Sequence, residues 1–131
     1  MIELEVATAR SRELVDVTDA VVGAVVELGV REGAVLVASP HTTAGVTINE
    51  GYDPDVAGDL VRRLERLAPR EGQGDRHAEG NSDAHLAVAL VGTSVVIPVV
   101  EDGLRLGRWQ RIFLLEWDGP RARRLLVSKL S

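Results

Sequence analysis

The sequence predicts a single α+β domain spanning residues 1–131, mainly an antiparallel β-sandwich with two long helices and one short helix. With 131 residues, 45% of them hydrophobic, the chain can form one domain that buries roughly two thirds of its unfolded surface. Strand-like segments, about eight in all, outnumber the segments with helical periodicity. Strands and helices do not follow a regular βαβ order, and this favours α+β.

The first thirty residues predict a strand followed by a helix. Residues 2–6 alternate apolar and acidic side chains, which is typical of a half-buried strand. From about residue 16 to residue 28, apolar side chains recur at every third or fourth position, so this segment predicts an amphipathic helix. The expected caps are Asp16 or Thr18 at its start and Gly29 or Gly33 at its end.

The next segment predicts two strands and the second long helix. Residues 34–38 are all apolar and predict a strand buried on both faces, and residues 45–49 predict a further strand. Asp53 and Pro54 then provide an N-cap and a proline at the first helical position. The expected buried stripe of this helix is Val56, Leu60, Leu64 and Leu67, and Pro69 ends it.

The remaining segments predict a loop, the short helix and further strands. Residues 70–83 are acidic and glycine-rich, and a loop of this length in a compact domain is usually functional or disordered. Residues 84–91 predict a helix capped by Ser82 or Asp83 and ended by Gly92. Residues 93–100 and 104–106 predict a hairpin turning at 101–103, and residues 109–117 and 124–129 predict paired strands that turn at 118–120.

Composition excludes several classes of function. The net charge of −5 argues against nucleic-acid binding, and no apolar run approaches the length of a membrane span. The first ten residues do not resemble a secretion signal, so a cytoplasmic location is expected. Because cysteine is absent and no dinucleotide, P-loop or nucleophile-elbow motif occurs, catalysis would depend on acid–base chemistry or on a metal bound by nitrogen and oxygen.

All three histidines fall in two short polar segments, which suggests one shared site. In the first, His41, Thr42 and Thr43 follow a predicted buried strand and combine a ring nitrogen with two hydroxyls, a set that suits a phosphate or carboxylate. The alternative is a turn anchored by Pro40, in which the threonines cap backbone groups and His41 is solvated.

The second segment has polar residues at every second position. An extended backbone would place them on one side as a row of ligands: His77, Glu79, Asn81, Asp83 and His85. The alternative is a capped helix start, which accounts for Ser82 and Asp83 without a ligand. The spacing matches no standard helical zinc motif.

Other polar positions have two interpretations each. Trp109 is either a core or subunit-contact residue or a stacking platform, and Ser94 either caps a turn or contributes to the site. The carboxylates Asp53, Asp55 and Asp59 fit a helix start better than a metal site.

The chain resembles the YjbQ family, also known as uncharacterised protein family 0047, over most of its length. The similar stretches are residues 41–50, 53–55, 59–60, 77–86, 92–94, 97–98 and 107–110, with Glu116. The resemblance implies an α+β sandwich subunit that forms a homotrimer with a polar pocket near the subunit contacts. It also implies the label secondary thiamine-phosphate synthase, which rests on a weak side activity. The chain departs from the family at Arg108, where relatives often carry threonine, and in the segment 73–76.

From the residues and the resemblance together we expect a metal-assisted enzyme that acts on a phosphorylated metabolite. His41, His77 and His85 would hold a divalent metal, zinc or magnesium, and the expected catalytic residues are Glu50 as general base, His41 and Asp83. The expected substrate-binding residues are Thr42, Thr43, Asn49, Asn81, Ser94, Arg108, Trp109 and Gln110. The expected partners are further copies in a homotrimer and a small anionic ligand, with neither nucleic acid nor membrane.

Two other hypotheses remain open. In one, the pocket belongs to a non-catalytic trimeric module that binds a metabolite or anion. In the other, the three histidines form hydrogen bonds between subunits and their role is structural.

Overall fold

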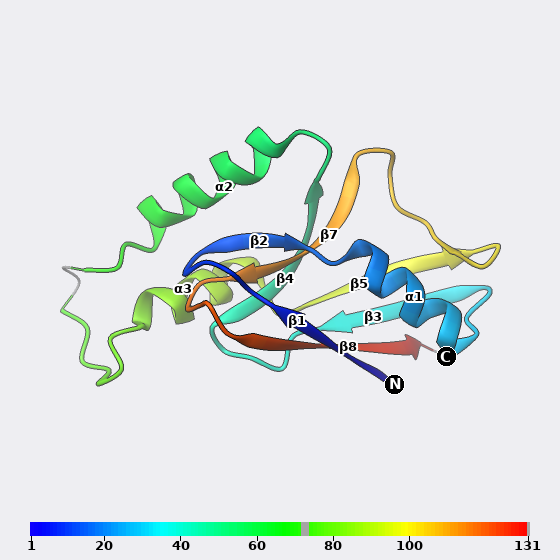
Figure 1. Ribbon diagram of the computed structural model, residues 1–131, viewed down its shortest axis with the longest axis horizontal. Helices are drawn as coiled ribbons and strands as arrows, with labels where there is room; N and C mark the ends of the chain where they lie inside the picture. The colour runs from blue at the N-terminus through cyan, green and yellow to red at the C-terminus, as the bar shows by residue number, and fades with distance from the viewer. Residues whose placement is uncertain (72–73, 131) are drawn as a thin grey trace.

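A computed structural model describes residues 1–71 and 74–130 (Figure 1), and these form two antiparallel sheets and three helices. The five-stranded sheet has the order β1-β8-β3-β5-β6 and the three-stranded sheet has the order β2-β7-β4. The strands are β1 (Ile2–Ala7), β2 (Glu13–Asp16), β3 (Gly33–Ala38), β4 (Ala44–Glu50), β5 (Ser94–Val100), β6 (Gly103–Leu104), β7 (Gln110–Glu116) and β8 (Ala122–Leu130). The helices are α1 (Thr18–Leu28), α2 (Pro54–Leu67) and α3 (Ser82–Val91).

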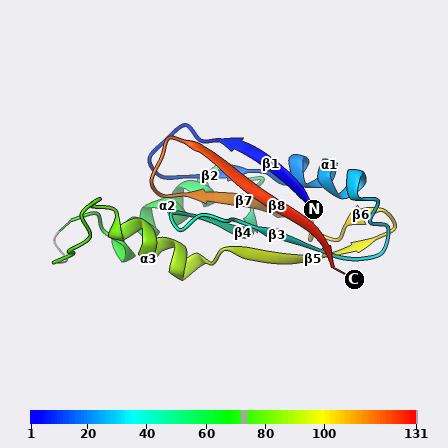
Figure 2. The same cartoon turned by 90° about the horizontal axis from the view of Figure 1, so that it is seen from below.

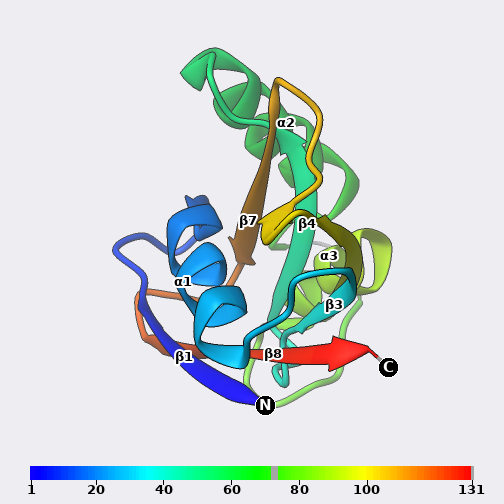
Figure 3. The same ribbon diagram turned by 90° about the vertical axis from the view of Figure 1, so that its right-hand side faces the viewer.

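The main core lies between the two sheets and α1. In the five-stranded sheet, alternate residues such as Val35, Ile97 and Val127 are buried, and they join one cluster with Val46 and Leu114 of the other sheet. Helix α1 contacts β1 and β8 of one sheet and β7 of the other, and Figure 3 shows it beside both. The predicted α+β fold with mainly antiparallel strands is therefore confirmed.

The predicted helix ends, the start of α2 and the hairpin turn are confirmed, but the predicted start caps of α1 and α3 are wrong. The N-cap of α1 is Val17 instead of Asp16 or Thr18, and that of α3 is Asn81 instead of Ser82 or Asp83, and neither has a side-chain cap bond. Gly29 ends α1 with a φ of 68°, a left-handed conformation that glycine adopts without strain. The Asp53 side chain accepts a hydrogen bond from the amide of Asp55 at the start of α2. Glu101 and Asp102 have φ values of 51° and 69°, as a tight hairpin turn requires, and they join β5 to β6.

The predicted pairing of residues 109–117 with 124–129 is wrong. Strand β7 pairs with β2 and β4, while β8 pairs with β1 and β3, so the turn between them carries the chain from one sheet to the other. The amides of Gly119 and Arg121 bond to Ser11 and Thr8 of the β1–β2 link, which holds this turn in place. A turn signal predicts where the chain reverses, but not which neighbour the next strand selects.

Two further expectations differ from the structure. Strand β2, which is short and pairs with β7, was not predicted. The expected buried stripe of α2 is also wrong: no residue of this helix is buried, and Leu67 is 65% exposed. Helix α2 projects from the body of the molecule (Figure 1), so its apolar side is only partly covered. None of the helices within residues 1–71 and 74–130 has the length and apolar character needed to cross a membrane.

Three links that cross between the sheets meet at one end of the sandwich. They are the β1–β2 link with Thr8, the β3–β4 link with His41 and the β7–β8 link with Asp118. Helix α3 begins beside them, and Figure 2 shows that it leads directly into β5. Polar side chains from these separate segments are thereby brought together.

Candidate functional site

A polar cavity of about 410 Å³ occupies this end of the sandwich and contains all three histidines. They come from separate segments, since His41 follows β3, His77 ends the long loop and His85 lies in the first turns of α3. The full lining is Pro40, His41, Thr42, Thr43, His77, Glu79, Asn81, His85, Asp118, Arg121 and Arg123. The structure therefore brings the two histidine-containing segments together. Of the predicted substrate-binding residues, Thr42, Thr43 and Asn81 line the same cavity.

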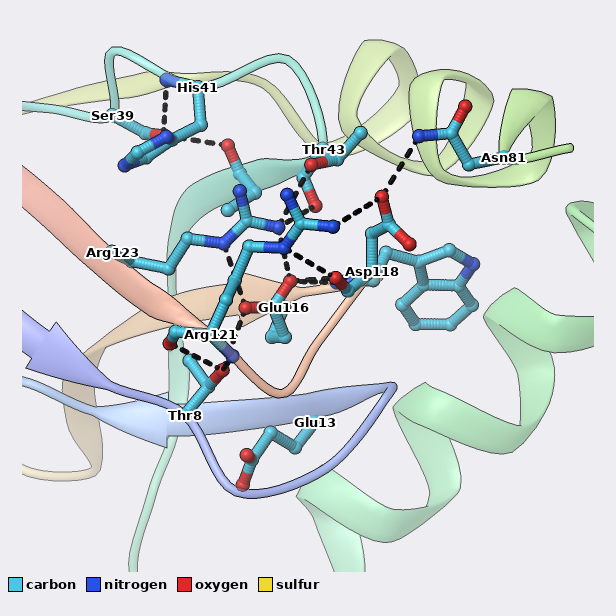
Figure 4. A network of polar contacts seen from close by, with 12 residues as sticks. Thr8, Glu13, Ser39, His41, Thr43, Asn81, Glu116, Asp118, Arg121 and Arg123 are labelled. Atoms are coloured by element: carbon cyan, nitrogen blue, oxygen red, sulfur yellow. Dashed lines mark hydrogen bonds and ion pairs between the residues drawn. The ribbon is translucent and has the colours of Figure 1, made fainter. Parts of the chain in front are cut away.

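A buried ion pair between Glu116 and Arg123 lies beneath the cavity (Figure 4). Arg123 donates from Nε to Glu116 Oε2 at 2.8 Å and from Nη2 to Oε1 at 2.5 Å. Glu116 also accepts from the Thr8 hydroxyl and from the amides of Trp117 and Asp118. Burial raises the pKa of Glu116, but the bonds from Arg123, the Asp118 amide and Thr8 outweigh it, so the pKa is lowered from 4.5.

Arg121 is held at the cavity by Asp118, which is in turn held by Asn81. Asn81 Nδ2 donates to Asp118 Oδ2 at 2.9 Å, and Arg121 Nη2 donates to the same oxygen at 3.1 Å. Arg121 Nε donates to the Asp118 carbonyl, while Arg123 Nη2 donates to the carbonyl and hydroxyl of Thr43. The Nη1 groups of the two arginines take no part in these bonds and are available as donors to a ligand.

His41 is a neutral imidazole in this arrangement. Its Nε2 accepts a hydrogen bond from the Arg124 amide at 2.9 Å, so a neutral ring carries its proton on Nδ1. Burial and the positive charge of Arg123 lower the pKa of His41 from its ordinary value of 6.5, against the opposing effect of Glu116. With one nitrogen accepting and the other protonated, His41 offers a ligand a hydrogen-bond donor.

We expect His41 to titrate below pH 6.5, because folding favours its neutral form. The folded state then binds fewer protons than the unfolded state as pH falls below 6.5. The contribution of His41 to stability is present above that pH and is lost on acidification through the window between the two pKa values. An NMR titration of the His41 ring in the native protein and in urea tests this, and a native midpoint at or above the urea value would contradict it.

The rings of His77 and His85 lie edge to face with their centroids 5.5 Å apart. Two imidazoles that share a tetrahedral zinc, with Zn–N bonds near 2 Å, have centroids roughly 5 Å apart, so the separation of this pair is close to that of two rings on one metal. The Glu79 carboxylate lies 3.9 Å from His77 Nε2. Within residues 1–71 and 74–130, no three His, Asp or Glu side chains converge as a metal-binding group, so His41, His77 and His85 do not form a complete ligand set here.

A second cavity of about 380 Å³ adjoins the first and shares His41, Thr42 and His85 with it. Its other walls are Val88, Ala89, Gly92 and Thr93. The three shared residues thus stand between a polar compartment and a more apolar one.

Glu50, Asn49 and Asp83, predicted from the sequence as site residues, lie outside the histidine cavity. Glu50 accepts hydrogen bonds from the amides of Tyr52 and Asp53, and Asn49 accepts one from the amide of Glu50. Both lie at the far end of β4 from His41, a span of roughly 20 Å for an extended strand of this length. Asp83 is buried and bonds to Arg12 at 2.6 Å on the opposite side of α3.

The predicted residues of the 94–110 region also lie apart from the cavity. Ser94 is exposed at the start of β5, and the Gln110 side chain accepts from the amide of Gly107. Trp109 is 53% exposed, with Arg108 stacked over it at 4.7 Å and Tyr52 against it at 5.7 Å. Tyr52, Arg108 and Trp109 form an exposed aromatic–arginine cluster of their own.

Glu79, part of the predicted ligand row, lines the cavity, whereas Asp118, Arg121 and Arg123 were not predicted as site residues. One signal could have indicated part of this group: Glu116 stands in an otherwise apolar run, residues 112–117, and a carboxylate in a buried strand needs a cation beside it. Arg111, Arg121 and Arg123 are the arginines close to Glu116 in the chain, and any of them is a candidate for that cation.

Comparison with known proteins places the whole chain in one family. A family model described as UPF0047 protein YjbQ-like matches residues 2–131. The chain is 42% identical to UPF0047 protein YugU of Bacillus subtilis over 128 residues, covering 98% of this chain and 97% of that protein. It is 45% identical over 130 residues to a UPF0047 protein of Archaeoglobus fulgidus, covering 98% and 99%.

Solved structures show the same relationship. A YjbQ/UPF0047 family protein from Clostridium acetobutylicum superposes with a TM-score of 0.94 at 43% identity, covering 98% of each chain. A conserved hypothetical protein from Thermus thermophilus superposes with a TM-score of 0.92 at 46% identity, covering 99% of this chain and all of that one. The chain is therefore a member of the UPF0047 protein YjbQ-like family.

Proposed function

We propose that the histidine cavity is the active site of a metal-assisted enzyme that acts on a small phosphorylated metabolite. The observation that carries the proposal is the convergence of three histidines and two arginines, from segments far apart in the sequence, on one polar cavity. Such a set combines possible metal ligands with donors for an anion.

The arginines and His41 supply the donors for a phosphate group. Arg121 Nη1, Arg123 Nη1 and the Nδ1–H of His41 are not used by the bonds described above, and charge-assisted bonds from guanidinium to phosphate are strong. Both arginines are already paired with carboxylates, Asp118 and Glu116. They therefore contribute directed hydrogen-bond donors more than net positive charge.

His77 and His85 would hold the metal, and imidazole nitrogens favour zinc over magnesium. The bound metal would neutralise charge on the phosphoryl oxygens. Among the cavity carboxylates, Asp118 is engaged by Asn81 and Arg121, whereas Glu79 accepts a longer bond of 3.4 Å from Asn81, so we assign the role of proton acceptor to Glu79. Glu50 and Asp83 have structural hydrogen bonds in this subunit instead.

The adjoining cavity suggests a substrate with a small apolar part joined to its phosphate. Val88, Ala89 and Gly92 would contact that part, while His41 and His85 lie at the junction of the two compartments. The thiamine-phosphate synthase activity implied by the family resemblance uses a substrate of this kind, a heteroaromatic ring bearing phosphate.

Calorimetry with zinc, inorganic phosphate and benzyl phosphate tests the proposal on the purified protein. We expect one zinc per chain, and loss of zinc binding by at least tenfold in the His77→Asn/His85→Asn variant, with His41→Asn as the matched control that retains zinc. We expect benzyl phosphate to bind more tightly than phosphate, and the Ala89→Leu variant to lose that difference. Absence of zinc binding, or equal binding by the double variant, would reject the metal site, and ligand binding without turnover of any phosphorylated substrate would favour the non-catalytic module.

We also propose that the protein self-associates as a homotrimer. Four large apolar side chains are exposed on the consecutive elements α3 and β5: Leu86 (44%), Leu90 (55%), Val96 (56%) and Val100 (45%). Large exposed apolar side chains are typical of subunit interfaces.

Light scattering after size exclusion tests this association. The wild type should have the mass of three chains, and Val96→Asp should yield smaller species, because a carboxylate would be buried without a partner. Val26→Asp on α1, at a side chain 68% exposed, is the matched control and should leave the mass unchanged. A monomeric wild type would refute the trimer.

A further inference from the structure

An apolar chamber of about 130 Å³ lies between helix α2 and the three-stranded sheet. Val46 and Leu114 face the main core, so their neighbours along the strands, Thr47 and Leu115, point to the opposite face of this sheet. The chamber is therefore separate from the main core. Its lining consists of Leu14 of β2, Thr47 and Asn49 of β4, Leu60 and Leu64 of α2, Val91 at the end of α3 and Leu115 of β7.

The chamber accounts for the incomplete burial of the apolar stripe of α2. Leu60 and Leu64 belong to this stripe and line the chamber, and both are only half-buried because the chamber separates them from the sheet. The helix is anchored beyond them instead. Ala68, directly after its last turn, is fully buried in a second hydrophobic cluster, and Glu65 forms an ion pair with Arg12.

The walls of the chamber do not suit an ion or a group of waters. Over residues 1–71 and 74–130, its lining includes no charged side chain. Its volume corresponds to roughly four water molecules at about 30 Å³ each, and each buried water needs two to four polar partners. Thr47 and Asn49 are the polar residues among the described walls, and Asn49 Oδ1 already accepts the Glu50 amide. The chamber therefore favours an apolar occupant.

We propose that the chamber binds one small uncharged apolar molecule, a ring or a branched aliphatic group about the size of benzene. An engineered protein cavity of about 150 Å³ lined by leucine, isoleucine and phenylalanine stays dry and binds benzene or xenon. This chamber has a similar volume and is lined by four leucines and one valine. Thr47 and Asn49 form one polar wall, which accommodates a single neutral polar group on the ligand.

A ligand at this place would complete the packing of α2. It would contact the sides of Leu60 and Leu64 that face the chamber and Leu115 on the sheet opposite, so apolar surface on both would be buried against it. Helix α2 would then be held to the sheet along its length as well as at Ala68.

NMR of the methyl groups of the full chain, during titration with benzene, tests the proposal. We expect intermolecular NOEs from benzene to the methyl groups of Leu14, Leu64 and Leu115, which line the chamber from three separate elements. A crystal pressurised with xenon should contain the gas at the same place.

Variants that fill the chamber make the test specific. Leu64→Phe should weaken benzene binding by about tenfold or more, because the larger side chain occupies the place of the ligand. Leu60→Phe fills the chamber from the neighbouring turn and gives a second measurement if Leu64→Phe does not fold. Leu67→Phe is the matched control: it lies on the same helix, is 65% exposed and does not line the chamber, so it should keep benzene binding.

Three results would overturn the proposal. The first is a wild type with neither benzene NOEs nor xenon at the chamber, and the second is unchanged benzene affinity in both filling variants. The third is a crystal structure in which a side chain of a second copy occupies the chamber. The described walls of this chamber include no residue of the histidine cavity or of the cavity beside it, so the metal and phosphate measurements are independent of these results.

Discussion

Replacing Arg123 with methionine is expected to lower the free energy of unfolding by about 3–5 kcal/mol, the usual cost of removing one partner of a buried ion pair. Glu116 is fully buried and would keep its charge with only the Thr8 hydroxyl and two amides to stabilise it. The two residues also belong to different sheets, so the loss would weaken the contact between β7 and β8. Urea unfolding followed by circular dichroism measures the effect.

The double variant Glu116→Leu/Arg123→Met is the control for this prediction. Replacing a whole buried pair by apolar residues of similar volume is often neutral, so the double variant should recover much of the loss. A loss of less than about 1 kcal/mol in Arg123→Met, the range for surface pairs, would show that the pair contributes no more than an exposed one.

The same pair gives stability a defined pH dependence. Because the folded state holds the pKa of Glu116 below its ordinary value of 4.5, the folded state binds fewer protons than the unfolded state in acid. The contribution of Glu116 to stability is therefore full above pH 4.5 and is lost as pH falls through its lowered pKa in the folded state. In the Arg123→Met variant, the bond that most opposes the burial-induced rise in the pKa of Glu116 is lost. Stability should therefore begin to decline at a higher pH than in the wild type.

The Asp83→Ala variant is expected to lose about 2–3 kcal/mol of stability and to keep benzyl phosphate binding in its folded fraction. The Asp83 side chain is 5% exposed and that of Arg12 is 15% exposed, so removing the carboxylate leaves a largely buried cation. Arg12 also stacks on Trp117 at 4.9 Å and bonds to Glu65, and it thereby ties α2, α3 and the end of β7 together. Thermal unfolding and calorimetry on the same preparation separate the two effects.

The Glu65→Gln variant removes the more exposed partner of Arg12 and serves as the comparison. Its side chain is 43% exposed, so we expect a change of 0 to about 1 kcal/mol. If Asp83→Ala instead kept its stability and lost ligand binding, Asp83 would have the catalytic role that the sequence analysis assigned to it.

The features that the sequence predicted well are those that depend on neighbouring residues. Gly29 ends α1 and Asp53 caps α2 because both effects act within one helical turn. The partners of β7 and β8 depend instead on how the 118–121 turn docks on the β1–β2 link, and no local pattern contains that information. Helix α2 has a strong apolar stripe, but its burial depends on what packs against it.

The candidate site shows the same division. The gathering of the histidines in two polar segments predicted that they meet, and the fold places them in one cavity. The family resemblance predicts that Glu50 shares the pocket with His41, but within one subunit the extended strand β4 separates them. Arg123 and Glu116 are seven residues apart, and only the crossing between sheets brings them together beneath the cavity.

The position of the cavity at the crossings between sheets gives it a mechanical property. His41 and Asp118 lie on links that join the two sheets, so a molecule that binds both links resists separation of the sandwich at that end. A ligand that binds only the closed form then lowers the fraction of molecules that are locally open at this end. Slower amide hydrogen exchange in β4 and β8 together would therefore report a bound metabolite, and a screen based on exchange could identify it before any reaction is known.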